Sequence, residues 1–152
     1  MALMITNTGW ARFFCRVMLG TIFLMAGLYK CFEMTPLGHA RLYFTEPYAD
    51  TWIPHFLLLL SGVTIPVVEL VAGALLILGW RTREALVAIG FILLTVTYGH
   101  LLKDALFSIT NHIFPRTALM VATFLLPSRD DVLSLDYYLV SNPGPGPPES
   151  GS

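Results

Sequence analysis

The longest apolar stretch of the chain runs from Phe56 to Trp80 and contains a single ionisable residue, Glu69. A helix of about 20 apolar residues crosses the ~30 Å hydrocarbon core of a bilayer, so this stretch predicts a membrane-spanning helix. A carboxylate near the middle of such a helix costs about 2.5–3.5 kcal/mol on insertion scales. That cost falls if the carboxylate is protonated or paired. The pattern therefore also predicts a partner for Glu69.

Three further apolar runs are long enough to predict membrane spans. The first covers Ala11–Lys30 and the third covers Glu84–Lys103. The fourth covers Ser108–Leu126, if Pro115 is accepted inside it, and ends at Pro127. Because a chain in lipid must satisfy its backbone hydrogen bonds internally, we expect an all-α membrane protein, with four transmembrane helices in an up-down-up-down bundle.

The segments outside the spans predict two short helices and a tail. The polar, aromatic-rich connection Cys31–His55 predicts a short interfacial helix around Leu37–Phe44. A second surface helix is expected near Leu133–Leu139. We expect one transmembrane domain over residues 1–140, followed by a disordered Pro/Gly-rich tail over 141–152.

Composition supports this class of protein. The 152 residues are 55% hydrophobic and 12% charged, whereas a soluble domain has about 25% charged residues. The net charge of -1 gives no reason to expect a nucleic-acid partner, and the lipid bilayer is the expected environment. We predict a multi-pass protein of the inner (plasma) membrane. The termini are predicted to be cytoplasmic, because slightly more basic residues fall on their side: Arg12, Arg16, Arg81, Arg83 and Arg129.

Polar and small residues recur on one face of each predicted span. Residues three or four apart share a helix face, and polar groups cannot face lipid cheaply. Small residues also allow helices to approach closely. We therefore expect these four faces to meet: Arg12, Arg16, Gly20, Phe23, Gly27 and Lys30; Gly62, Pro66, Glu69, Gly73 and Leu76; Leu86, Gly90, Leu93, Thr97, His100 and Asp104; His112, Arg116, Leu119 and Thr123.

Alternation of the spans predicts which ionisable groups share a depth. Glu69 should lie below a half-buried cluster at one side of the membrane, and Arg16 towards the opposite side. We expect Arg116 or Arg16 to pair with Glu69, and His100 to share its proton. An alternative is that such groups are structural ion pairs that fix helix register. The cluster comprises Lys30, Glu33, His100, Asp104, His112 and Arg116.

These residues are the candidates for chemistry. Glu69 and His100 are the candidate catalytic, proton-moving groups. His100 and Asp104 share a helix face, with His112 one loop later, but no tight Cys/His cluster supports a metal site, and we predict none. The candidate ligand-binding residues are Arg16, Lys30, Asp104, His112 and Arg116.

Two ordered motifs resemble a known family. The first span reads Arg16-x-x-Leu19-Gly20-x-x-Phe23-Leu24-x-Ala26-Gly27-x-x-Lys30. The second ends Glu69-Leu70-x-Ala72-Gly73-x-Leu75-Leu76-x-Leu78-Gly79 and is followed by Thr82-Arg83. Over residues 12–127 the chain resembles the DoxX family of small four-helix membrane proteins. The family's polar positions carry over to Arg16, Lys30 and Glu69.

The resemblance implies several roles. Relatives are linked to thiosulfate:quinone oxidoreductase, to redox-stress membrane complexes, or to assembly of other membrane proteins. Cys15 and Cys31 form no CxxC motif, which argues against thiosulfate oxidation here. The hypothesis is an accessory or quinone-interacting subunit of a membrane redox complex, either in a larger assembly or as a homo-oligomer. No cofactor is encoded, and quinone is the candidate ligand.

Other functions stay open from the sequence. A stand-alone small-molecule or ion permease and an assembly factor are the alternatives. In the accessory role, the loop Tyr43–Trp52 and the surface helix near Leu133–Leu139 are expected to bind the partner. The surroundings of Glu69 separate the hypotheses. A closed pair without a cavity favours structure, and an open polar pocket favours quinone-linked oxidoreductase chemistry.

Overall fold

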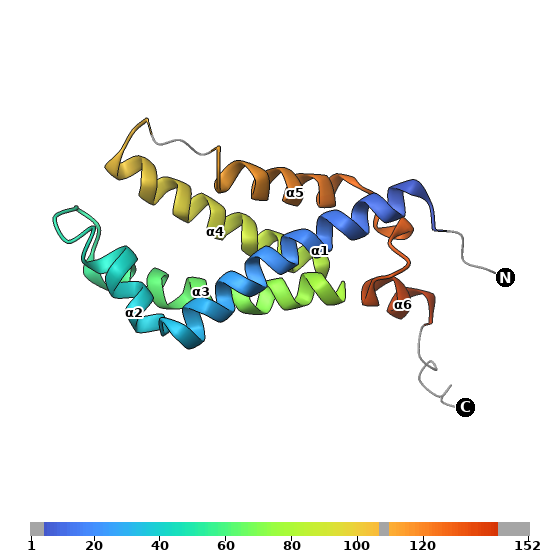
Figure 1. Cartoon of the computed structure of the whole chain (residues 1–152), viewed down its shortest axis with the longest axis horizontal. Coiled ribbons are helices and arrows are strands. Elements are labelled where there is room, and N and C mark those ends of the chain that lie inside the picture. The colour runs from blue at the N-terminus through green and yellow to red at the C-terminus, as the bar shows by residue number, and fades with distance from the viewer. Residues whose placement is uncertain (1–4, 107–109, 143–152) are drawn as a thin grey trace, which may run out of the picture.

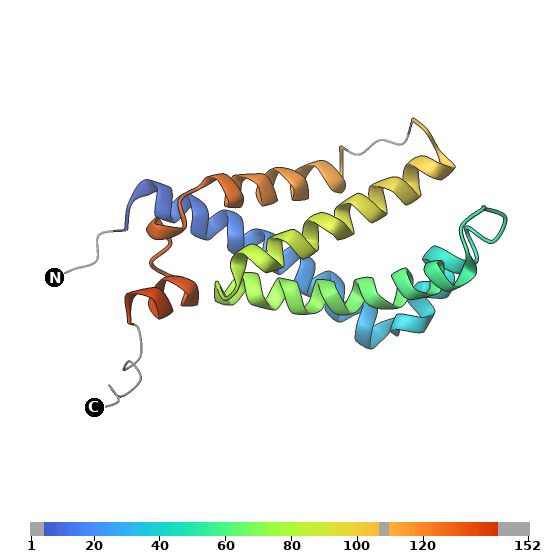
Figure 2. The same cartoon turned by 180° about the vertical axis from the view of Figure 1, so that it is seen from behind.

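The computed structural model describes residues 5–106 and 110–142, and every regular element within those ranges is a helix. The four larger helices run alternately up and down, with α1 crossing α3 and α5 lying beside α4 (Figure 1). The reverse view in Figure 2 shows α3 and α4 diverging from their shared turn. The four helices are α1 Asn7–Leu28, α3 His55–Leu78, α4 Thr82–Lys103 and α5 Ile113–Leu125.

Among the described residues, three stretches are long and apolar enough to cross a membrane, namely Asn7–Glu33, His55–Leu78 and Thr82–Lys103. Helix α5 has 13 residues, a length of about 20 Å at 1.5 Å per residue. The predicted fourth span, Ser108–Leu126, is therefore found as a shorter apolar helix beside three long spans, and residues 108 and 109 lie outside the described part of the chain. Proline costs least in the first turn of a helix, where its missing N–H has no intrahelical partner, so Pro115 favours a start of α5 close to it.

The short helix predicted around Leu37–Phe44 is found as α2, Pro36–Ala40, which continues into a π-helical turn, Arg41–Thr45, and its place at the membrane surface stays a prediction. Interactions of neighbouring residues explain why α2 begins at Pro36. Pro36 occupies the first turn, where its missing N–H costs nothing, and the Thr35 Oγ1 accepts a hydrogen bond from the Gly38 N–H at 3.2 Å.

The predicted surface helix is found as α6, Leu135–Ser141, and Ser134 Oγ caps it by accepting from the Tyr137 N–H at 3.1 Å. Helix α6 lies beside the α3–α4 turn (Figure 1), and the preceding segment Ser128–Asp130 contacts α1. The predicted tail at 141–152 overlaps the last residue of α6, and residues 143–152 lie outside the described part of the chain.

The core forms where α1 and α3 cross with their backbones in contact. A Cβ atom at Gly27 would collide with the backbone of Leu70, and one at Gly73 would collide with the backbone of Leu24. Lipid offers no hydrophobic force between helices, so this close van der Waals packing favours their association. The faces predicted for the first and second spans therefore do meet. The surrounding core includes Leu19, Phe23, Leu76, Leu86 and Ile89.

Candidate functional site

Glu69 is buried in the middle of α3 and forms a closed ion pair with Lys30. The Lys30 Nζ donates to Glu69 Oε1 at 2.9 Å and to Oε2 at 2.7 Å, so one ammonium occupies both carboxylate oxygens. The Glu69 side chain is 5% exposed and that of Lys30 is 25% exposed. A charge at this depth is tolerated because it is paired and hydrogen-bonded.

Lys30 reaches Glu69 from an unusual piece of backbone. Directly after α1 the chain forms a π-helical turn, Tyr29–Glu33, which the Met34 N–H closes by donating to the Tyr29 carbonyl at 3.1 Å. π-Helical turns are rare in proteins, and those that occur are frequently found at functional sites. This turn places the last basic residue of the first span against the middle of the second.

His39 completes the backbone of α3 at its proline. Pro66 has no N–H, so it cannot bond the carbonyl of Gly62 four residues earlier. The His39 Nδ1 lies 2.7 Å from that carbonyl oxygen and donates to it, since a carbonyl can only accept. Gly62 allows this approach, because a Cβ there would collide with Ala40 in α2. Burial lowers the pKa of His39 below its ordinary value, which favours the neutral ring.

A second buried group lies at the opposite end of the helix pair and is called here the arginine cluster: Arg12, Arg16 and Asp131. The Arg16 side chain is 0% exposed, and its Nε donates to Asp131 Oδ2 at 2.9 Å. The Arg12 Nε lies 3.5 Å from the same carboxylate oxygen. Two cations therefore share one carboxylate.

Helix ends supply the remaining negative charge. Arg12 donates to the carbonyls of Thr123 and Leu126 at the end of α5, and Arg16 donates to those of Leu76 and Ile77 at the end of α3. The last carbonyls of a helix lack intrahelical partners and carry partial negative charge. The cluster thereby ties α1, α3 and α5 together at one end.

The segment after α5 also holds the turn between α3 and α4. The Asp136 carboxylate accepts from the N–H groups of Arg81 at 2.8 Å and Thr82 at 2.9 Å, which caps the start of α4. The Asp136 N–H donates to the Gly79 carbonyl at 2.8 Å. Gly79 adopts φ 66°, a left-handed conformation that favours glycine, and ends α3 there. Residues 131–136 thus clamp the end of the bundle.

The structure changes the expected pairing of Glu69. Arg16 pairs with Asp131, and the Arg116 guanidinium lies 5.7 Å from the centre of the Phe23 ring, so neither is the partner of Glu69. The reason is geometric: antiparallel α1 and α3 place the end of α1 beside the middle of α3, within reach of a lysine stem.

The other candidates gather at the far end of α4 and the start of α5. His100 and Asp104 are exposed, and so is His112 immediately before α5. The Asp104 Oδ1 accepts from the Leu106 N–H at 3.0 Å in the connection that follows. Within residues 5–106 and 110–142, no group of three or more His, Cys, Asp or Glu side chains is placed to hold a metal ion. The catalytic and ligand-binding roles given to these residues stay predictions.

Sequence reasoning missed two residues that the structure brings to the centre. Asp131 lies in a polar Ser-Arg-Asp-Asp run that reads as a surface turn, yet it is 2% exposed. The sequence signal for Asp131 was that Arg12 and Arg16 lie in the first predicted span, which contains no acidic residue. For His39, the signal was the carbonyl that Pro66 leaves without a donor.

A cavity of about 500 Å³ lies between α3 and α4, away from this ion pair. Neither Lys30 nor Glu69 lines it. The Glu69 carboxylate is turned towards Lys30 at the end of the first span, and the cavity lies on the side of α3 that faces α4. The cavity and the buried charges are therefore separate features of the molecule.

One comparison with known proteins gives a match. Residues 8–108, which are 101 of the 152 residues, match a family model described as methylamine utilisation protein MauE. This matched segment includes α1 to α4 with Lys30, His39 and Glu69, and it stops before α5 and Asp131. No curated protein and no solved structure matches the chain.

Proposed function

The chain belongs to the MauE family, a DoxX-related family of small membrane proteins, and from that premise we propose that it is an accessory subunit of a membrane redox complex. The family description is methylamine utilisation, and we carry that process over as the setting of the complex. In this role the chain supplies a docking and scaffolding unit, and a partner supplies the redox centres.

The observation that carries the proposal is the closed Lys30–Glu69 pair. Both oxygens of the carboxylate are occupied by one ammonium, and the pair does not line the cavity. A proton-transfer group must present a free atom to its substrate, whereas a pair that fixes register needs only its partner. The arrangement therefore favours a structural role for Glu69 over a quinone-linked catalytic role.

In this proposal two surfaces bind the partner, the loop Tyr43–Trp52 at one end of the bundle and α6 at the opposite end (Figure 1). Tyr48 anchors the loop, since its side chain is buried and the Lys103 Nζ lies 5.0 Å from its ring centre. Trp52 is 77% exposed on the same loop, and Val140 is 82% exposed on α6. Large exposed apolar groups beside anchored ones are typical of protein contacts and of membrane interfaces.

The membrane placement is part of the same proposal. We place α5 in the bilayer as a fourth, shorter segment beside the three long spans of an inner-membrane protein. Both the start of α1 and α6 then lie on the cytoplasmic side, in line with the basic residues there.

The test is purification of the tagged full chain in mild detergent, followed by mass spectrometry and an absorption spectrum of the eluate. We expect stoichiometric co-purification of a subunit with haem, flavin or iron–sulfur absorption. A colourless, solitary protein would contradict the proposal. A Trp52→Ala/Val140→Ser variant is the matched control: it should accumulate normally and lose the coloured partner, because it alters exposed side chains only.

A further inference from the structure

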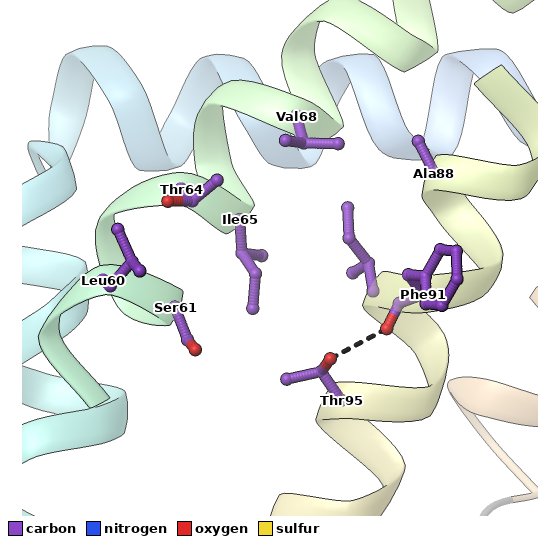
Figure 3. A pocket seen from close by; sticks show the side chains of 9 residues that line it. Leu60, Ser61, Thr64, Ile65, Val68, Ala88, Phe91 and Thr95 are labelled. Carbon is purple, nitrogen blue, oxygen red and sulfur yellow. Dashed lines mark hydrogen bonds between the residues drawn. The ribbon is translucent and has the colours of Figure 1, made fainter. Parts of the chain in front are cut away.

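The cavity between α3 and α4 is built differently from the lipid-facing surfaces around it. It is lined by side chains of both helices, mostly aliphatic or aromatic, with hydroxyl groups among them (Figure 3). Both helices are candidate membrane spans, so the cavity opens at membrane depth. The lining residues are Leu60, Ser61, Thr64, Ile65, Val68, Ala88, Phe91, Ile92 and Thr95.

Two hydroxyls of this lining, those of Ser61 and Thr64 on α3, lack within the described residues the partner that other helix hydroxyls have. Several threonines donate to the carbonyl one turn earlier, at 2.6 to 2.9 Å: Thr21, Thr95, Thr97, Thr117 and Thr123. The Ser61 hydroxyl makes no hydrogen bond with any residue in the described part of the chain. Figure 3 shows it pointing from α3 into the space between the helices. A hydroxyl donor in an apolar medium is unfavourable without an acceptor.

The opposite wall offers only an acceptor. Thr95 faces Ser61 across the cavity in Figure 3, and its hydroxyl hydrogen is given to the Phe91 carbonyl at 2.8 Å. The oxygen of Thr95 keeps a lone pair for a second contact. The uncommitted donors of the lining therefore lie on α3, and Ser61, which points into the cavity, calls for a ligand with an acceptor oxygen.

The depth of the hydroxyls restricts the ligand to molecules that dissolve in the membrane. Ser61 lies about 9 Å along α3 from His55, and Thr95 about 12 Å along α4 from Lys103, at 1.5 Å per residue. Water-soluble molecules do not reach such a position between two spans without a polar path. A ligand must bring apolar surface to the aliphatic walls and an oxygen to Ser61.

We propose that this cavity binds a membrane-soluble molecule that combines an apolar chain with a carbonyl oxygen, and that the carbonyl accepts a hydrogen bond from Ser61. The cavity volume, about 500 Å³, falls within the range of small-molecule sites, about 300–1,000 Å³. Two sources share this chemistry, namely the ring carbonyl of an isoprenoid quinone and the ester carbonyl of a phospholipid.

The test measures which molecule stays with the protein. The full chain is placed in nanodiscs of phosphatidylethanolamine and phosphatidylglycerol containing graded amounts of ubiquinone, and is then released for native mass spectrometry. We expect one bound adduct per chain, whose mass identifies it as quinone or phospholipid. Ala88→Phe fills the cavity and should lower occupancy at least tenfold. Ser61→Ala should weaken binding about fivefold, the effect of one neutral hydrogen bond.

The matched control is Thr21→Val, which removes an exposed hydroxyl from α1, outside the cavity. It should leave occupancy unchanged. Ser61→Ala removes one oxygen only, so it stays informative if Ala88→Phe does not accumulate. No adduct in the wild type, or equal occupancy in wild type and Ser61→Ala, would overturn the site.

This site is independent of the proposed accessory role. Ser61→Ala should retain any coloured partner in the detergent purification, because Ser61 lines the cavity, whereas no residue of the loop Tyr43–Trp52 or of α6 does. If Ser61→Ala loses the adduct but retains the partner, the cavity binds the ligand and takes no part in binding the partner. Loss of the partner together with the adduct would contradict a separate ligand site.

Discussion

Within the described residues, two buried ionic groups stabilise charge inside the helix bundle in different ways. The arginine cluster places two guanidiniums, one carboxylate and the carbonyl ends of two helices in a closed network. The other group is a single pair, in which the flexible Lys30 stem meets Glu69 and stays partly exposed. The difference shows that the number of charges and their bonds to helix ends determine how rigidly each group holds the helices together. Five-donor guanidiniums lock three helices, and one ammonium joins two.

The comparison also separates two parts of the chain. The Lys30–Glu69 pair lies wholly within the segment that matches the family model, whereas the counter-charge of the arginine cluster, Asp131, lies beyond it. The matched segment therefore includes both members of the pair and both arginines of the cluster, but not the carboxylate of Asp131.

The largest effect is expected at the arginine cluster. Arg16→Met leaves Asp131 and the carbonyl of Leu76 without their donor in a buried site, which should cost about 4–5 kcal/mol of unfolding free energy. We expect the variant to fail to accumulate, as measured by fluorescence-detected size exclusion. Arg129→Gln is the control, because that side chain is 87% exposed and should have no effect. Normal accumulation of Arg16→Met would show that the cluster does not hold the bundle.

The next effect tests the asymmetry of the pair. Lys30→Met leaves the buried Glu69 charge without a partner and should cost about 3 kcal/mol. Glu69→Gln should cost only about 1 kcal/mol, because the partly exposed Lys30 can turn its ammonium towards water. Thermal midpoints in one detergent measure both variants. Equal losses would mean that Lys30 is held as rigidly as the arginines.

A smaller effect is expected at the clamp. Asp136→Asn weakens the cap on the first N–H groups of α4 and should cost about 1 kcal/mol. The expected readout is faster amide hydrogen exchange at Arg81 and Thr82, with the arginine cluster unchanged. Slower or equal exchange at Arg81 and Thr82 would show that Asp136 does not stabilise the start of α4.

These contacts show how far the sequence alone reached. The spans were predictable because some 20 consecutive apolar residues have few other solutions in water. The glycine-lined faces of α1 and α3 were predictable from helical spacing. The partner of Glu69 was not, because spacing gives the direction of a side chain and not its reach. The boundary of α5 depended on Pro115, and Asp131 looked like an ordinary turn residue.

The smallest effect concerns pH and the connection that contacts α3. Burial lowers the pKa of His39 below 6.5, so the unfolded state binds more protons than the folded state between the two pKa values. Stability from this group is complete above pH 6.5 and falls as the pH drops below it. His39→Asn, which keeps a donor for the Gly62 carbonyl, should flatten a plot of thermal midpoint against pH. An unchanged slope would assign the acid sensitivity to another group.

The most direct test of the accessory role removes the pair without leaving a lone charge. The double variant Lys30→Met/Glu69→Met is purified beside the wild type, and the absorption spectrum and turnover of the co-purified complex are compared per mole of chain. We expect the double variant to accumulate better than Lys30→Met and to retain the coloured partner with unchanged turnover. A double variant that accumulates and binds its partner but has lost turnover would contradict the account and make Glu69 a catalytic group.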